Sequence, residues 1–184
     1  MKFCSQCGHP MQRRIPDGDH FEREVCDHCG YIQYYNPKVI VGCIPVWQQR
    51  IVMCRRSIEP RLGYWTFPAG FMELHETAAE GAAREAAEES GVPVTVDDLL
   101  AVIDLPHVGQ IYMLYRGRAQ SAAVHPTDET SEVRLMTEAE IPWDRIAFPT
   151  ISHGLKFFFA DRAAGHYSIH TLNLRGATLH SDAA

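Results

Sequence analysis

Three glutamates in the middle of the chain have a spacing that could bind a metal ion: Glu85, Glu88 and Glu89. Side chains three or four residues apart lie on the same face of an α-helix, so these carboxylates would share one patch. Like charges at this spacing cost roughly 0.2–0.5 kcal/mol per pair. Solvated acidic faces usually carry lysine among the acids, and this segment has none. The pattern therefore predicts a site for a hard divalent cation, Mg²⁺ or Mn²⁺, with a solvated acidic face as the alternative.

The helix that must position these glutamates has clear ends in the sequence. Thr77 and Glu80 have the spacing of a capping box, which begins the helix at Thr77 and leaves Glu76 in the preceding loop. Gly91, with a proline two residues later, ends it. The interior is mostly alanine, which lets a helix lie close to a sheet. We expect Arg84 to point away from the glutamates and not to neutralise all of them.

Cysteines near the N-terminus have the spacing of a second metal site: Cys4, Cys7, Cys26 and Cys29. They form two CxxCG pairs, which are typical of a zinc ribbon. The segment between the pairs is too polar and short for a core of its own, so a metal ion would be its main source of stability. We interpret this ion as structural zinc, because four thiolates leave no open position; a redox dithiol or a catalytic zinc is the alternative. The neighbouring histidines are interpreted as solvated, although they could substitute as ligands: His9, His20 and His28.

The rest of the chain predicts an α+β domain. A boundary at Asn36-Pro37 gives a zinc ribbon over 1–36, a main domain over 37–175 and a flexible tail over 176–184. Cys43 and Cys54 lie in apolar runs and are expected in the core. The expected strands cover 38–47, 50–57, 99–106, 109–118, 131–137 and 167–174, and a second helix covers 151–164. Elements in this order favour helices packed around a mixed sheet.

The glutamate segment also matches a known pattern over its whole length. From Gly70 the sequence reads glycine, five residues, Glu76, seven residues, and then Arg84-Glu85-Ala86-x-Glu88-Glu89-x-Gly91-Val92. This resembles the Nudix box, and only Ala86 stands where a larger aliphatic residue is common. The resemblance implies a Nudix hydrolase fold, an α/β/α sandwich around a mixed sheet. It also implies that the loop-helix-loop of the box binds a divalent metal ion and that a water molecule attacks a pyrophosphate linked to a nucleoside.

The resemblance assigns roles to individual residues of the box. Glu85, Glu88 and Glu89 would be the metal ligands. Glu76 would be a further ligand or a support, and Arg84 would orient a carboxylate. General chemistry supports a metal ion in such a reaction independently of the resemblance. The ion neutralises the charge that develops on phosphate and lowers the pKa of a bound water.

Charged residues outside the box are candidates for contacts with phosphate or metal. Arg56 ends a strand beside Arg55 and could pair with phosphate oxygens. Glu73, in the loop before the helix, could bind metal or ribose hydroxyls, or simply be solvated. A glutamate in a late loop often acts as a base or an extra ligand in the family, and of Glu129 and Glu132 we choose Glu132.

Other residues are candidates for the walls of a substrate pocket. Gln110 and Tyr112 share one face of a strand, although a half-buried strand would look the same. One of three aromatic residues before the box is expected to stack on a base, and the others to lie in the core: Tyr64, Trp65 and Phe67.

Most of the chain resembles a Nudix subgroup with a zinc ribbon that includes a plant chloroplast enzyme cleaving FAD and ADP-ribose. The resemblance therefore implies FAD or ADP-ribose as substrate, with AMP and a second monophosphate as products. The NADH pyrophosphatase group normally has an SQPWPFP-type motif soon after the box, whereas residues 93–110 here read PVTVDDLLAVIDLPHVGQ. NADH and nucleoside triphosphates are thus the alternative substrates.

Composition limits the classes of partner. The chain has 184 residues, 46% of them hydrophobic, and a net charge of −6, which gives no general reason to bind nucleic acid or anionic membrane. Its start lacks the apolar run of a signal peptide, and no segment approaches a membrane span. We therefore expect a cytoplasmic protein that acts on a small nucleotide, and the resemblance implies a homodimer. The alternative of another class is a nucleotide-sensing module whose ribbon binds nucleic acid or protein, which the complete set of box carboxylates disfavours.

Overall fold

The computed structural model describes residues 2–176 of the chain, so the predicted tail lies outside the described residues except for Gly176. The chain separates into two compact units, which meet at Asn36 and Pro37. Each is described by itself. Within residues 2–176, no helix is both long enough and apolar enough to cross a membrane.

The N-terminal unit is a small antiparallel sheet of three strands, with the order β1-β2-β3. These are β1 (Met11–Arg14), β2 (Arg23–Cys26) and β3 (Ile32–Gln33). The two cysteine pairs lie in matching turns, in which the amides of Gly8 and Gly30 bond to the carbonyls of Cys4 and Cys26 at 2.9 and 2.8 Å. Both glycines have φ near +74°, a conformation that other residues rarely adopt. The glycine after each pair is therefore what lets the turn close.

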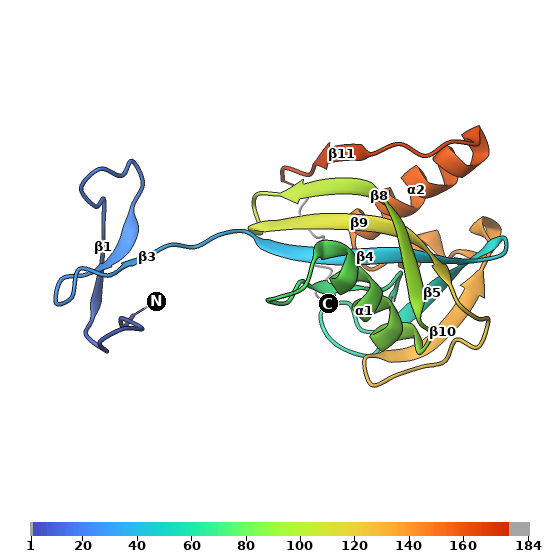
Figure 1. Cartoon of the computed structure of the whole chain (residues 1–184), viewed down its shortest axis with the longest axis horizontal. Helices are drawn as coiled ribbons and strands as arrows, with labels where there is room; N and C mark the ends of the chain where they lie inside the picture. The colour runs from blue at the N-terminus through green and yellow to red at the C-terminus, as the bar shows by residue number, and fades with distance from the viewer. Residues whose placement is uncertain (1, 177–184) are drawn as a thin grey trace. The chain divides into compact units, whose positions relative to one another are not determined.

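The main unit is built on a mixed sheet with the strand order β10-β5-β4-β9-β8-β11 (Figure 1). Two short strands extend it, since β6 pairs with β5 and β7 pairs with β4. The pairs β4·β9 and β8·β11 are parallel, and the other neighbours are antiparallel. The strands are β4 (Lys38–Trp47), β5 (Arg50–Arg56), β6 (Trp65–Thr66), β7 (Ala69–Phe71), β8 (Val94–Leu105), β9 (Gln110–Ala119), β10 (Thr130–Met136) and β11 (His170–Asn173). The predicted mixed sheet is confirmed.

Two strands differ from the prediction in length. β8 begins at Val94, five residues before the expected start, and its acidic residues pair with the neighbouring strand: Asp97 with Arg118 and Asp98 with Arg116. The register of β8 against β9 shifts twice in this part. β11 covers only His170–Asn173, half the expected length.

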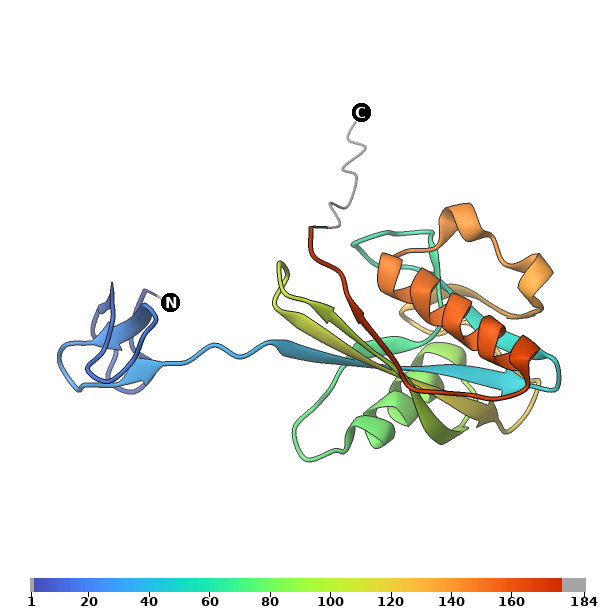
Figure 2. The same ribbon diagram turned by 90° about the horizontal axis from the view of Figure 1, so that it is seen from above.

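Two α-helices cover opposite faces of the sheet, α1 (Ala78–Ser90) and α2 (Pro149–Ala164), which confirms the sandwich (Figure 2). Two short 3₁₀ helices, Glu138–Glu140 and Trp143–Arg145, precede α2. The larger core lies under α2 and includes Leu155 and Phe158. The smaller core lies under α1, where Ala82 and Ala86 pack against Val41 and Cys43 of β4. Small side chains on this face of α1 bring its backbone close to the sheet.

Helix α1 has the ends that the sequence predicts. Thr77 is the N-cap and forms a capping box with Glu80, and Gly91 ends the helix in the left-handed conformation with φ of 71°. The amide of Glu80 donates to the Thr77 hydroxyl at 3.2 Å, and the amide of Thr77 donates to the Glu80 carboxylate at 2.8 Å. The cap thus fixes where the helix starts and which face carries the glutamates.

Removal of the cap should weaken the fold measurably. We expect Thr77→Ala to lower the free energy of unfolding by about 1 kcal/mol, because it leaves the amide of Glu80 without its acceptor. Urea unfolding monitored by circular dichroism measures this change. Thr77→Ser keeps a hydroxyl and should behave like the parent chain. Equal losses in both variants would show that the methyl group matters and the cap does not.

Candidate active site

Three glutamates of the box bond to one arginine, Arg84. Its Nε and Nη2 donate to the two oxygens of Glu76 at 3.0 and 2.8 Å, and its Nη1 donates to Glu85 at 2.8 Å and to Glu88 at 3.0 Å. Nη2 also donates to the carbonyl of Phe71 at 3.1 Å. All five N–H groups of the guanidinium are thus used. The prediction that Arg84 points away from the glutamates is wrong; the expectation that it cannot neutralise all of them holds, because one charge faces several carboxylates.

The pKa of Glu76 is lowered from its ordinary value, and that of Glu89 is raised. The hydrogen bonds from Arg84 lower the pKa of Glu76 to about 2. Glu89 is 5% exposed, and its Oε2 atom is buried with no hydrogen-bond partner. Burial, with Glu85 nearby, raises the pKa of Glu89 to about 8, while the charge of Arg56 opposes the rise. A buried carboxylate oxygen without a partner is a position that a cation could satisfy.

The Glu85 carboxyl group lies against Gly70 of strand β7. A Cβ atom added at Gly70 would lie 2.3 Å from this carboxyl group, so any larger residue would displace it. Burial raises the pKa of Glu85 above its usual range, although Arg84 opposes the change. The glycine that opens the box therefore lets a metal-ligand candidate keep this position.

A shallow depression of about 270 Å³ lies over the carboxylates, and residues before β10 form its other side. It is lined by Glu85, Glu88, Glu89, Thr127, Asp128 and Glu129. Oxygen ligands of this kind suit Mg²⁺ or Mn²⁺, and the unpartnered Glu89 oxygen fits the same ion. Within residues 2–176, the box glutamates are spread more widely than the cysteines, whose ligand atoms all lie within 4.8 Å of one another.

The structure brings Glu129, and not Glu132, to the acidic depression. Glu132 lies on β10, where it pairs with Arg55 at 3.7 Å and with Arg134. Glu73 is exposed, and only its amide takes part, donating to Glu76 at 2.7 Å. Neither of these two predicted residues lines the acidic depression.

The four cysteines of the ribbon have the geometry of a tetrahedral zinc site. The Sγ atom of Cys7 lies 3.5 Å from the Sγ atom of Cys26 and 3.4 Å from that of Cys29. The Sγ atoms of Cys4 and Cys29 are 3.7 Å apart. A tetrahedron with Zn–S bonds of about 2.3 Å has edges of about 3.8 Å, close to these separations. The cysteines therefore fit one zinc ion.

The histidines of the ribbon were interpreted as solvated. His9 and His28 are indeed exposed, and they stack with ring centroids 3.6 Å apart beside Cys7. His20 is exposed and belongs to no such cluster.

Loss of one cysteine ligand should unfold the ribbon alone. We expect Cys26→Ser to lose bound zinc and amide protection over residues 2–36 while the main unit stays folded, because the ribbon has little core of its own. Elemental analysis and hydrogen exchange measure the two effects. Cys54→Ala is the matched control, since this buried cysteine lies in the main unit and the variant should keep its zinc. Full zinc content in Cys26→Ser would contradict the assignment.

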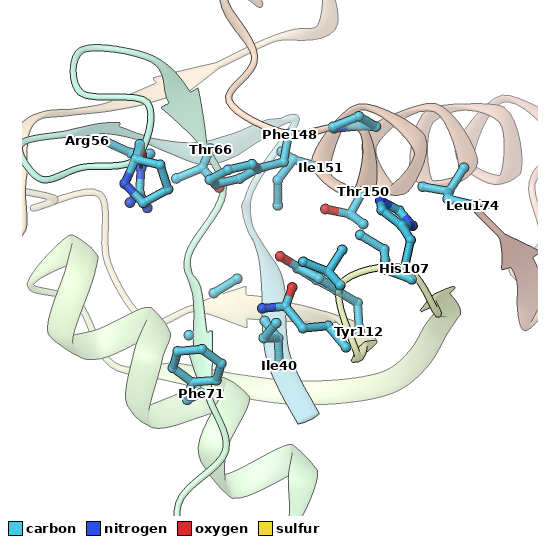
Figure 3. Close-up of a pocket in the computed structure, with 17 residues that line it drawn as sticks. Ile40, Arg56, Thr66, Phe71, His107, Tyr112, Phe148, Thr150, Ile151 and Leu174 are labelled. Atoms are coloured by element: carbon cyan, nitrogen blue, oxygen red, sulfur yellow. Dashed lines mark hydrogen bonds between the residues drawn. The ribbon is translucent and has the colours of Figure 1, made fainter. Parts of the chain in front are cut away.

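A second cavity, of about 300 Å³, lies in the main unit (Figure 3). Arg56, Gln110 and Tyr112, three of the predicted contacts, line it. Its aromatic walls are Phe71 and Phe148, which the sequence analysis missed because apolar residues next to strands and helices usually lie in a core. Trp65 and Phe67 are buried elsewhere, and Tyr64 is half-buried between Arg61 and Arg145; none of these three lines the cavity.

Strand β7 separates the cavity from the acidic depression. Ala69 and Gly70 line the cavity, while Gly70 also contacts the Glu85 carboxyl group. Arg56 lines the cavity, its Cζ atom lies 5.4 Å from the ring centroid of Phe148, and its charge reaches Glu89. A ligand with a flat group in the cavity could thus place phosphates beside Arg56 and the carboxylates.

Family models match both units of the chain. The model of the Nudix N-terminal zinc ribbon covers residues 2–35, and that of the NUDIX domain covers residues 36–153, which is more than half of the chain. This chain belongs to the Nudix family. A crystal structure of a NUDIX hydrolase from Nitrosomonas europaea is similar over 95% of this chain and 100% of that one, with 47% identity and a TM-score of 0.90.

More distant relatives of this Nudix chain match in part. The NAD-capped RNA hydrolase NudC of Salmonella heidelberg (strain SL476) is 39% identical over 95 residues, which are 50% of this chain and 34% of that protein. The chain thus spans about a third of the length of the curated relatives that it matches. An ADP-ribose pyrophosphatase from Streptococcus suis 89-1591 has 15% identity and a TM-score of 0.62 over 74% of this chain and 99% of its own, a likeness of fold alone.

The buried charge of Glu89 should make stability depend on pH when no Mg²⁺ is present. The folded protein holds a proton on Glu89 up to about pH 8, against an ordinary pKa of 4.5, so it binds this proton more tightly than the unfolded chain does. The contribution to the free energy of unfolding is therefore full below about pH 4.5 and is lost as pH rises to about 8, a change on the order of a few kcal/mol. Urea unfolding across this range measures it.

Glu89→Gln is the control for this dependence. Its neutral amide cannot ionise, so the decline with pH should be smaller than in the parent chain. Mg²⁺ should stabilise the parent chain at pH 8 more than the variant. An equal decline in both chains would assign the dependence to other groups.

Proposed function

We propose that this protein hydrolyses the pyrophosphate bond of a dinucleotide-like compound in the presence of Mg²⁺. The observation that carries the proposal is the unpartnered, buried oxygen of Glu89 in a depression that adjoins a ring-sized cavity across β7. A cation held there would lie next to phosphates bound beside Arg56. FAD and ADP-ribose are the leading substrates, and AMP is the common product.

The roles of the residues follow from their positions. Glu85 and Glu89 would hold the cation from the buried side and Glu88 from the exposed side, while Arg84 keeps Glu85 and Glu88 in place through its hydrogen bonds. A bound Mg²⁺ would supply neutralisation of phosphate charge and activation of the attacking water. Arg56 would pair with a phosphate oxygen.

Glu129 replaces Glu132 as the residue that we propose for proton acceptance. It lines the same depression as the metal-ligand candidates, whereas Glu132 is ion-paired on β10. A base must lie within hydrogen-bond reach of the water or one water away, and Glu129 is the late glutamate placed for this. The water would add to one phosphorus, the bridging oxygen would leave with the other phosphate, and two monophosphates would result.

Two other functions compete with this one. The NAD-containing name of the Salmonella relative favours NADH or a related compound as substrate. A nucleoside triphosphate would instead release diphosphate together with its nucleoside monophosphate. A nucleotide-sensing module of the same fold would bind substrate without turnover, with the ribbon engaging nucleic acid or protein. Location in the cytoplasm and formation of a homodimer stay predictions.

Product analysis with Mg²⁺ tests the proposal. We expect FAD to yield AMP and FMN, and ADP-ribose to yield AMP and ribose 5-phosphate, as resolved by liquid chromatography. Glu89→Gln should lower the rate by about 100-fold or more, because it removes a charged metal ligand. Glu138→Gln, at an exposed glutamate of a 3₁₀ helix, is the matched control and should keep full activity.

Each contrary result points to one alternative. Release of diphosphate from nucleoside triphosphates, with no AMP from the dinucleotides, would favour nucleoside triphosphates as the substrates. A much higher rate of hydrolysis of NADH than of FAD and ADP-ribose would favour NADH as the substrate. Binding without turnover of any compound, together with salt-sensitive affinity for RNA or DNA, would favour the sensing module.

A further inference from the structure

The N-terminus of helix α2 opens into the cavity. Its first residues, Pro149, Thr150 and Ile151, line the cavity together with the N-cap residue Phe148. Phe148 has no side chain that could accept a hydrogen bond, so no side chain caps this helix of 16 residues. Pro149 has no N–H group, so the first-turn amides without an acceptor in the helix are those of Thr150 and Ile151, and they lie at the positive end of its dipole. The cavity therefore has a wall that can donate hydrogen bonds.

Thr150 adds an unpartnered hydroxyl to the same wall. Thr150 is 0% exposed, and its buried Oγ1 atom has no partner within normal hydrogen-bond distance. The Tyr112 hydroxyl is its polar neighbour: burial raises the pKa of Tyr112, and Thr150 opposes the rise. Figure 3 shows this oxygen and the hydroxyl of Tyr112 directed into the same space between the cavity walls. A buried hydroxyl left unpaired costs stability, and folded proteins rarely keep one without a ligand, a water or a function that uses it. Two independent features, the helix end and Thr150, thus point into one part of the cavity.

The chemistry of this wall selects the kind of ring that would bind. Backbone amides can donate but cannot accept, and a helix N-terminus favours partial negative charge. Carbonyl oxygens of a heterocycle meet both conditions. Adenine has no carbonyl group and could accept only through its ring nitrogens, and its amino group would add a further donor. The opposite walls are apolar and include Ile40, Phe71 and Val108, which suits the faces of a flat ring.

We propose that the first turn of α2, with the hydroxyls of Thr150 and Tyr112, binds the carbonyl oxygens of a flat heterocycle, so that the cavity takes the half of a dinucleotide substrate opposite adenine. The inference rests on the proposed function, because it takes the phosphates to lie beside Arg56. Flavin and nicotinamide both carry carbonyl groups. Flavin fits better, because it presents two ring carbonyls and is neutral, whereas the oxidised nicotinamide ring is cationic and would face the positive end of the helix.

Binding of the separate halves of a dinucleotide tests the inference without hydrolysis. FMN, nicotinamide mononucleotide and AMP each carry one phosphate and no anhydride bond, so differences between them report the ring. Isothermal titration calorimetry with the full chain should show FMN binding at least about tenfold more tightly than AMP or nicotinamide mononucleotide. FAD binding to Glu89→Gln, measured by flavin fluorescence, gives a second readout on the whole substrate.

Thr150→Val tests the hydroxyl itself. It removes the donor at nearly constant volume and should weaken FMN about fivefold while leaving AMP unchanged, since one neutral hydrogen bond is lost. Thr150→Ser should restore the affinity for FMN. Thr95→Val makes the same change at an exposed position of β8 and should have no effect. The melting temperature of Thr150→Val should not fall, which separates loss of binding from loss of fold.

The outcomes separate this inference from the proposed function. An unchanged affinity for FMN in Thr150→Val, or an affinity for AMP that falls by the same factor, would overturn the inference even if FAD is hydrolysed. Tighter binding of nicotinamide mononucleotide than FMN would overturn the choice of flavin. Tight FMN binding that depends on Thr150, without hydrolysis of any dinucleotide, would support the subsite and overturn the proposed function.

Discussion

The close approach of strand β7 to helix α1 is the contact on which the rest of the site depends. Gly70 leaves no room for a side chain against Glu85, and on the neighbouring strand a Cβ atom at Gly42 would lie 2.7 Å from that of Ala69. The backbone of β7 is thus held between β4 and α1. Only strand β7 lies between the carboxylates and the cavity, so both can contact adjacent parts of a single ligand.

Charge in the acidic half of the site is balanced only in part. Arg84 uses every donor it has, yet the acids around it outnumber it, and Glu89 is buried out of its reach. The four cysteines of the ribbon are positioned in another way. They lie in two short pairs on matching turns, so their positions do not depend on a buried core. One site is therefore assembled by the packing of a whole domain, and the other by local turns.

Local signals made much of this structure predictable. Short stretches of sequence are enough to predict the ends of α1, the cysteine pairs and most strands. The direction of Arg84 was not predictable in this way, since it depends on the loop that brings Glu76 and the carbonyl of Phe71 to it. Neither was the choice between Glu129 and Glu132, because the pairing of β10 with β5 shifts register at its start and side chains of a strand alternate between faces. Phe71 and Phe148 look like core residues until the cavity between them is seen.

The pairing of β4 with β9 has a consequence for how the protein folds. This parallel pair at the centre of the sheet joins Lys38 to Gln110, and β7 and α1 belong to the long stretch of chain between them. Contacts between residues so distant in sequence form slowly, because the entropy of closing the intervening loop is lost before the contacts are gained. The ribbon can close its turns early and alone, whereas the carboxylates reach their final positions only once the middle of the sheet has formed.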